Sequence, residues 1–146
     1  MEVDRNGLEV LGRTECLALL ATVTLGRIGL TSAALPTILP VNFRLVGDDI
    51  VVHTAAGTKL DAATRNAVVA FEADAMDPVE HTGWSVVVTG VAREAVDDEL
   101  AALTRVPLAR WAPLGDERVI AIAAQLISGR RITHGLTMPN RQGRDG

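Results

Sequence analysis

Aromatic residues are scarce in this sequence. No tyrosine occurs among the 146 residues, and the aromatic side chains are limited to two tryptophans and two phenylalanines. Proteins that bind single strands of nucleic acid stack bases on aromatic side chains, and those that bind duplexes present a strongly basic face. A formal net charge of −4 does not suit such a face. We therefore expect no nucleic-acid partner.

Cysteine and long apolar runs are equally scarce. Cys16 is the only cysteine, which excludes an internal disulfide and a cysteine-based zinc site. The three histidines, His53, His81 and His134, do not have the spacing of metal ligands. No apolar run is long enough to cross a bilayer, and the first residues do not resemble a signal peptide. The sequence predicts a cytoplasmic protein with no metal site and no membrane partner.

The apolar residues that are present predict a mainly β protein with short helices. Runs rich in β-branched residues are bounded by Gly, Pro, Asp and Asn, which is typical of strands joined by turns. The expected strands cover residues 26–32, 35–46, 49–54, 67–74, 84–96 and 117–132, with a turn at 47–49, a loop at 76–83 and a Gly-Arg-Arg turn at 129–131. About six strands connected in this way indicate an antiparallel barrel. We expect one domain over residues 1–133 and a mobile tail at 134–146.

Three short helices complete this prediction. They cover residues 13–22, 58–65 and 97–105, and Thr14 can cap the first of them. Cys16 falls close to the apolar side of that helix, so we expect a buried and inert thiol. Two prolines in the run 35–46 favour an edge position or interrupted pairing for that strand.

The stretch Gly57-Thr58-Lys59 stands between an expected strand and an expected helix. A glycine lets the backbone approach a ligand closely, and a threonine hydroxyl and a lysine ammonium are donors that suit a phosphate. Thr58 with Asp61 three residues later also resembles a capping box. The tripeptide could therefore hold a phosphate, or it could be the start of a capped surface helix with a solvated lysine.

The order of the motifs along the chain is similar to that of a known superfamily. Between about residue 12 and residue 133 the chain contains GRIGL, LPTILPVNF, IVVHTAAGTKL, AVVAFEAD, GWSVVVTGVA and ISGRRI in turn. This ordered set resembles the pyridoxamine 5′-phosphate oxidase-like superfamily, and in particular its small actinobacterial flavin-binding branch. The resemblance implies a split β-barrel that works as a homodimer, with flavin mononucleotide (FMN) in a cleft between the subunits.

The same resemblance assigns residues to the cofactor. They are the phosphate-binding corner (Thr54, Gly57, Thr58 and Lys59), the strand that lines the isoalloxazine ring (Pro40, Val41, Asn42 and Phe43), and the start of the strand beside the flavin (Trp84 and Ser85). A C-terminal turn (Gly129, Arg130 and Arg131) would reach either the partner subunit or the cofactor. His53 precedes the corner, and it could contact a phosphate or a substrate, or equally be a partly buried strand histidine.

Several functions remain open at this point. Authentic pyridoxamine phosphate oxidases have an arginine-rich stretch where this chain has WSVVVTG, so we do not expect vitamin B6 activity. The first hypothesis is an FMN-dependent oxidoreductase that acts on a small organic molecule. The alternatives are a flavin- or deazaflavin-binding protein for storage or sensing, a deazaflavin-dependent reductase, and a dimer without a cofactor; a few relatives bind haem. No catalytic residue is predicted, because hydride transfer at a flavin ring needs no dedicated acid–base pair.

Overall fold

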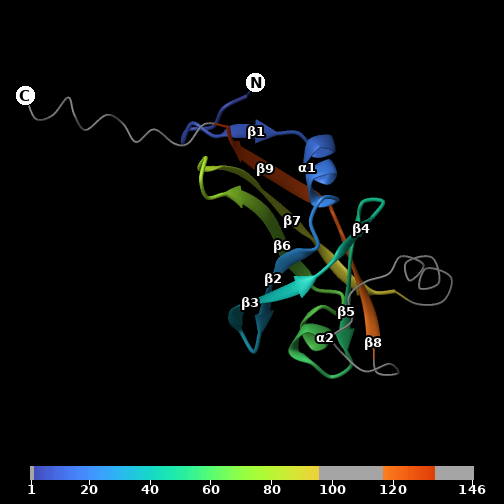
Figure 1. The fold of residues 1–146 in the computed structure, drawn as a ribbon. Helices are drawn as coiled ribbons and strands as arrows, with labels where there is room; N and C mark the ends of the chain where they lie inside the picture. Colours follow the sequence, from blue (N-terminus) through green and yellow to red (C-terminus); the bar gives the residue numbers. More distant parts are fainter. Residues whose placement is uncertain (1, 96–116, 134–146) are drawn as a thin grey trace, which may run out of the picture.

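The computed structural model describes residues 2–95 and 117–133, which form antiparallel strands and two short helices (Figure 1). In chain order these elements are β1 (Glu9–Leu11), α1 (Arg13–Leu20), β2 (Leu25–Ser32), β3 (Leu35–Asn42), β4 (Arg44–Val46), β5 (Asp49–Ala55), α2 (Lys59–Ala63), β6 (Val68–Asp77), β7 (Thr82–Glu94), β8 (Glu117–Ala123) and β9 (Leu126–Ile132). The mainly β, antiparallel fold is confirmed, but the described residues contain nine strands where the sequence predicted about six.

Strand β7 is the centre of the sheet. It pairs with β6 along one edge and with both β8 and β9 along the other. The strand order is β3-β2-β6-β7-β8-β5-β4, with β9 also pairing with β1. Twist accumulates over such a sheet and curls it, so that β3 approaches β5 although the two strands are not paired. The result is the split β-barrel that the resemblance implied.

A β-bulge explains why the predicted strand 117–132 is two strands. Ala92 is paired with Ile122, and Thr89 is paired with Leu126. The paired residues are therefore three positions apart in β7 but four positions apart in the facing segment from β8 to β9. One extra residue of this kind is the definition of a bulge. A Cβ atom on Gly90 would collide with the carbonyl oxygen of Ala123, so the close approach at the bulge requires glycine.

Four other predicted boundaries are corrected by the structure. The run 35–46 is interrupted at Phe43, which separates β3 from β4, and β3 is the expected edge strand. The predicted loop at 76–83 is a tight hairpin, because β6 and β7 remain paired as far as Asp77 and Thr82. The predicted turn at 129–131 lies inside β9 and is paired on both sides. Gly12 rather than Thr14 is the N-cap of α1, without a side-chain cap.

The inner face of the sheet forms the hydrophobic core. Alternate residues of β2, β6 and β7 point inward and are fully buried, among them Ile28, Phe71 and Val88. Phe43, at the break between β3 and β4, packs its ring edge-on against Phe71 with 4.7 Å between the centroids. Cys16 is buried as expected, and burial raises the pKa of its thiol.

The outer face of the same sheet carries an unusual number of apolar side chains. The strand registers place seven exposed apolar residues on it: Leu25, Ile38, Val68, Met76, Val87, Val91 and Leu126. Their exposed fractions range from 37% to 72%. The same face also carries the ion pairs of Arg27 with Glu72 and Asp74. Exposed apolar side chains gathered on one face commonly mark an interaction surface. We refer to these seven residues as the outer apolar face.

Two predictions fall outside the described residues, namely the helix at 97–105 and the tail at 134–146. Of the helices in residues 2–95 and 117–133, neither is long and apolar enough to cross a membrane.

Candidate functional site

A cavity of about 370 Å³ lies where the barrel is split. Strand β4 pairs only with residues 49–51 of β5, so among the described strands residues 52–55 have a partner on the β8 side alone. Strand β3 likewise pairs only with β2 within the described part of the chain. The cavity is therefore bounded by two strand edges, and backbone N–H and C=O groups at such edges can hydrogen-bond a ligand.

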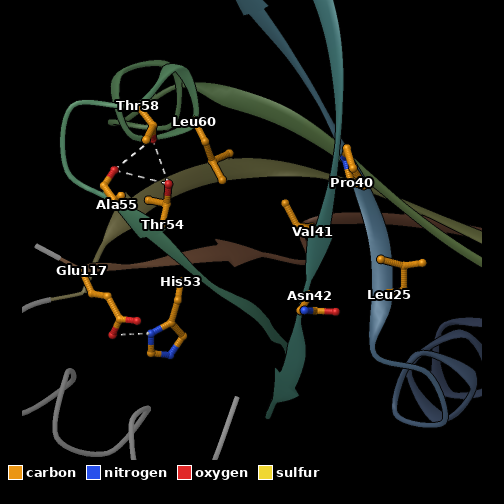
Figure 2. A pocket seen from close by; sticks show the side chains of 10 residues that line it. All are labelled: Leu25, Pro40, Val41, Asn42, His53, Thr54, Ala55, Thr58, Leu60 and Glu117. Carbon is orange, nitrogen blue, oxygen red and sulfur yellow. Dashed lines mark hydrogen bonds and ion pairs between the residues drawn. The ribbon is translucent and has the colours of Figure 1, made fainter. Parts of the chain in front are cut away.

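The cavity combines a mostly apolar lining with a few polar groups (Figure 2). Its lining residues are Leu25 of β2, Pro40, Val41 and Asn42 of β3, His53, Thr54 and Ala55 of β5, Thr58 before α2, Leu60 of α2, and Glu117 of β8. Figure 2 shows the β3 residues opposite the two threonines and His53. Both its size and this composition are typical of small-molecule sites, which measure roughly 300–1,000 Å³.

The corner between β5 and α2 is held in place by its own hydroxyl groups. The Oγ1 atom of Thr58 accepts a hydrogen bond from the Asp61 amide at 3.1 Å, which makes Thr58 the N-cap of α2 as predicted. The same hydroxyl donates to the Ala55 carbonyl at 2.9 Å and lies 2.9 Å from the Thr54 hydroxyl. Gly57 has a φ of +80°, a conformation that favours glycine. The corner therefore presents two adjacent hydroxyl groups to the cavity.

Asp61 connects this corner to the rest of the barrel. Its side chain is only 3% exposed, and it accepts a hydrogen bond from the Gly57 amide at 2.8 Å. The carboxylate also forms ion pairs with Arg65 at 3.1 Å and with Arg118 of β8 at 3.3 Å. Burial alone would raise the pKa of Asp61, but the Gly57 hydrogen bond and the two guanidinium groups outweigh it and lower that pKa. The corner is thus anchored by a buried, ionised carboxylate.

His53 and Glu117 form a second polar feature of the cavity. Nδ1 of His53 lies 3.4 Å from a carboxylate oxygen of Glu117, and the two side chains are 7% and 13% exposed. They come from the adjacent strands β5 and β8, where Ala55 is paired with Glu117 and His53 with Val119. This diagonal relationship brings the side chains together on one face of the strand pair.

The structure brings together six of the residues that the sequence predicted for the cofactor. Pro40, Val41, Asn42, His53, Thr54 and Thr58 line the cavity. Gly57 and Lys59 flank Thr58 in the corner, and Lys59 is an exposed residue of α2. Phe43 is 1% exposed and belongs to the core, next to Phe71.

Trp84, Ser85 and Arg130 lie elsewhere in the monomer. They line a second, smaller cavity of about 60 Å³ between the ends of β6, β7 and β9, which shares no lining residue with the first cavity. The guanidinium group of Arg130 donates a hydrogen bond to the carboxylate of Asp4 at 2.9 Å. Within a single chain, these three residues and the threonine corner therefore belong to separate sites.

Leu25, Ala55, Leu60 and Glu117 line the first cavity and were not predicted. Ala55 and Leu60 fall inside the motif IVVHTAAGTKL, which also contains the corner. Their closeness in sequence to Thr58 could have predicted that they line the cavity. Leu25 and Glu117 are distant in sequence and reach the cavity only through the pairing of β2 with β3 and of β5 with β8. In the ranges 2–95 and 117–133, no group of three potential ligands could hold a metal ion.

The fold is a split β-barrel with a mostly apolar cavity at its opening. The sequence model of pyridoxamine 5′-phosphate oxidase matches residues 12–131, and the chain belongs to this family. The family assignment made from the ordered motifs is therefore confirmed.

Individual relatives agree with this assignment. An uncharacterized protein of Mycobacterium tuberculosis is 42% identical over 127 residues, which cover 84% of each chain. A flavin adenine dinucleotide (FAD) binding protein of Mycobacterium smegmatis is 39% identical and superimposes with a TM-score of 0.76, covering 85% of this chain and 99% of that one. A candidate pyridoxamine 5′-phosphate oxidase of Corynebacterium glutamicum is 33% identical, with a TM-score of 0.76 and coverage of 86% and 98%.

Proposed function

We propose that this protein binds a flavin in the cavity between β3 and β5 and acts as an oxidoreductase on a small organic molecule. The observation that carries the proposal is the cavity itself, which joins two strand edges, an apolar lining and a corner of hydroxyl groups. FMN has the matching chemistry, because its flavin ring is planar and largely apolar with hydrogen-bonding edges, and its ribityl chain ends in a phosphate.

The corner fits the phosphate of FMN. The hydroxyl groups of Thr54 and Thr58 are 2.9 Å apart and face the cavity, and Lys59 is the next residue along the chain. On binding, the two hydroxyl groups would turn their protons from these internal hydrogen bonds to the phosphate oxygens, and the Lys59 ammonium group would add a positive charge. Asp61 does not compete for the phosphate, because its carboxylate is engaged by Gly57, Arg65 and Arg118.

The β3 side of the cavity fits the ring. Pro40, Val41 and Asn42 lie opposite the corner in Figure 2, with Leu25 beside them. Proline and valine offer a flat apolar surface, whereas Asn42 and the free edge of β3 offer hydrogen-bonding groups. Bound flavin supplies hydride-transfer chemistry, and these residues would orient the ring and keep water away from one of its faces.

We further propose that the protein is a homodimer formed through the outer apolar face. The seven residues of this face leave a large apolar area in water, which pairing with a second copy would cover. Leu25, Pro40 and Asn42 line the cavity from the same outer face that carries Ser85 and Arg130. In a two-fold dimer the surface near Arg130 can therefore approach the cavity of the other subunit. Trp84, Ser85 and Arg130 of one subunit would then lie beside the predicted cofactor residues of the other.

The cofactor is proposed to be FMN, and FAD is the second candidate. FAD is favoured by the similarity to the FAD binding protein of M. smegmatis, which is 39% identical. A deazaflavin, and a role in storage or sensing rather than catalysis, are the remaining alternatives. Haem finds no support in the described cavity, whose one histidine, His53, is turned toward Glu117.

The test begins with the absorption spectrum of the purified protein, followed by mass spectrometry of the compound that heat releases. A flavin spectrum and the mass of FMN are expected, and the mass of FAD or of a deazaflavin would identify the alternative. If the isolated protein is colourless, FMN, FAD and riboflavin are titrated in turn. Failure to bind any of them would refute the proposal. Reduction by a nicotinamide cofactor and rapid reoxidation by an added acceptor would distinguish an oxidoreductase from a storage protein.

A further inference from the structure

The cavity contains a buried acid–base pair that the family assignment does not explain. Of the residues that line the cavity, only His53 and Glu117 carry titratable side chains. Both are nearly buried, and most of their neighbours in the lining are apolar. A buried charged or polar group is costly unless it is paired, so the geometry of the pair has consequences for whatever binds there.

The geometry distinguishes the two ring nitrogens of His53. Nδ1 is the atom turned toward Glu117, at 3.4 Å from the carboxylate oxygen (Figure 2). This separation exceeds a normal hydrogen bond, and Nδ1 has no hydrogen-bond partner in the described structure. Hydrogen bonds of functional pairs are often long without a ligand and shorten when one binds. A small rotation of either side chain is enough to close the contact.

We propose that Glu117 is a positioning residue that holds neutral His53 in the Nδ1–H tautomer, so that Nε2 accepts a hydrogen bond from an N–H or O–H group of the bound ring system. A carboxylate can only accept a hydrogen bond from a neutral imidazole, so the proton must be on the nitrogen that faces it. The hydrogen bond made by one ring nitrogen fixes the role of the other. This inference rests on the proposed function for the identity of the ligand, but not for the tautomer.

Among the residues that line the cavity, no other charged group is placed to do the same. Lys59 of α2 is exposed and lies at the corner. Arg118, next to Glu117 in β8, is engaged by Glu94 at 2.7 Å and by Asp61 at 3.3 Å. The other side chains that face His53 across the cavity, from β2 and β3, are Leu25, Pro40, Val41 and Asn42, all uncharged. Within the lining of the cavity, Glu117 is therefore the one charged partner of the His53 ring.

The first measurement is the tautomer itself. Nitrogen-15 NMR of the imidazoles is recorded at pH 8.5, where a free imidazole is neutral, in a His81→Asn, His134→Asn background that leaves His53 as the only histidine. We expect the Nδ1–H tautomer in this protein and in Glu117→Gln, whose amide oxygen can still accept. We expect its loss in Glu117→Leu, or in Glu117→Ala if the leucine variant does not fold. An Nε2–H tautomer in the parent, or an unchanged one in the leucine and alanine variants, would overturn the proposal.

The second measurement is binding, with riboflavin and FMN as the probes. Glu117→Leu is expected to weaken both by the same factor, about fivefold or more, the scale of one lost hydrogen bond. Glu117→Gln should stay within twofold of the parent, and the ratio of FMN to riboflavin affinity should not change in either variant. Unchanged binding in Glu117→Leu would refute the role of Nε2. If the parent binds neither probe, the proposed flavin function fails, whereas the tautomer measurement still decides the role of Glu117.

Discussion

The carboxylate of Asp61 accepts a hydrogen bond from the backbone amide of Gly57 at 2.8 Å, within the first turn after a strand. At the same time the Asp61 amide donates to the Thr58 hydroxyl at 3.1 Å. The two bonds form a variant of the capping box, in which the carboxylate reaches the residue before the N-cap rather than the N-cap itself. This arrangement fixes the conformation of the loop at the corner. Lys59 and Asp61 are therefore the residues of the corner to substitute first.

Lys59→Ala should weaken FMN binding far more than riboflavin binding. If the corner holds the phosphate, the lysine contributes a charge-assisted hydrogen bond of roughly 1.5–3 kcal/mol, or about tenfold to hundredfold in affinity. Riboflavin has no phosphate, so its dissociation constant should hardly change. Both ligands are titrated by fluorescence in the same salt, because Lys59 is exposed and its charge is screened.

Arg13→Ala is the matched control for Lys59. It removes one exposed cation whose ion pair with Asp48, at 3.4 Å, lies away from the lining of the cavity. Affinity for both ligands should be unchanged in this variant. Equal losses of FMN and riboflavin binding in Lys59→Ala would mean that the lysine is only a solvated residue of α2.

Asp61→Asn should destabilise the protein at neutral pH by about 3 kcal/mol, the scale of breaking a buried ion pair. The folded-state pKa of Asp61 lies below its ordinary value of 3.8. Its stabilising effect is therefore present above about pH 4 and is lost as the pH falls through the folded-state pKa. Urea unfolding at several pH values should show that the difference between parent and variant shrinks below about pH 4.

Asp48→Asn provides the comparison for Asp61. Asp48 also pairs with an arginine, but its side chain is 67% exposed. An exposed pair contributes only about 0–1 kcal/mol, so this variant should unfold almost like the parent. A loss in Asp48→Asn as large as that in Asp61→Asn would argue against the special role of the buried carboxylate.

Ile38→Asp should convert the proposed dimer into a monomer. Ile38 is 72% exposed and lies in the outer apolar face, so a charge there would be buried by dimerisation without disturbing the monomer. Leu35→Asp is the control from the same strand, because Leu35 is 66% exposed but has the opposite strand parity. Sedimentation analysis should find a monomer only for Ile38→Asp. A monomeric parent that binds flavin would contradict the dimer proposal.

Phe43→Leu should affect stability and not flavin binding. Phe43 was predicted to line the ring, but it is 1% exposed and packs against Phe71 in the core. Truncation of a buried phenylalanine to alanine costs about 3–5 kcal/mol, so the milder change to leucine should cost about 1–2 kcal/mol. Val41→Ala alters the wall of the cavity, so this variant should lower both the stability and the flavin affinity. A large loss of affinity in Phe43→Leu with unchanged stability would restore the sequence-based assignment.

Much of the local structure was predictable from the sequence because its causes are local. The glycine and aspartate residues at 47–49 end one apolar run and begin another, and β4 and β5 form the hairpin that this pattern predicts. Thr58 caps α2 because its hydroxyl needs only the amide three residues later. The ordered motifs were enough to identify the family, and six of the predicted cofactor residues line one cavity.

The remaining features depend on pairing between distant segments, which no local pattern encodes. Phe43 has the parity of Val41, whose side chain faces inward, and it meets Phe71 of the distant strand β6 in the core. Residues 129–131 resemble a turn, yet β1 and β7 pair with them from both sides. Glu117 reaches His53 only because β8 pairs with β5. The sequence by itself determined the β4–β5 hairpin, the cap of α2 and the family. The tertiary structure decided how many strands form, which strand edges stay open and which side chains meet there, because hydrogen-bonded register over long separations sets all three.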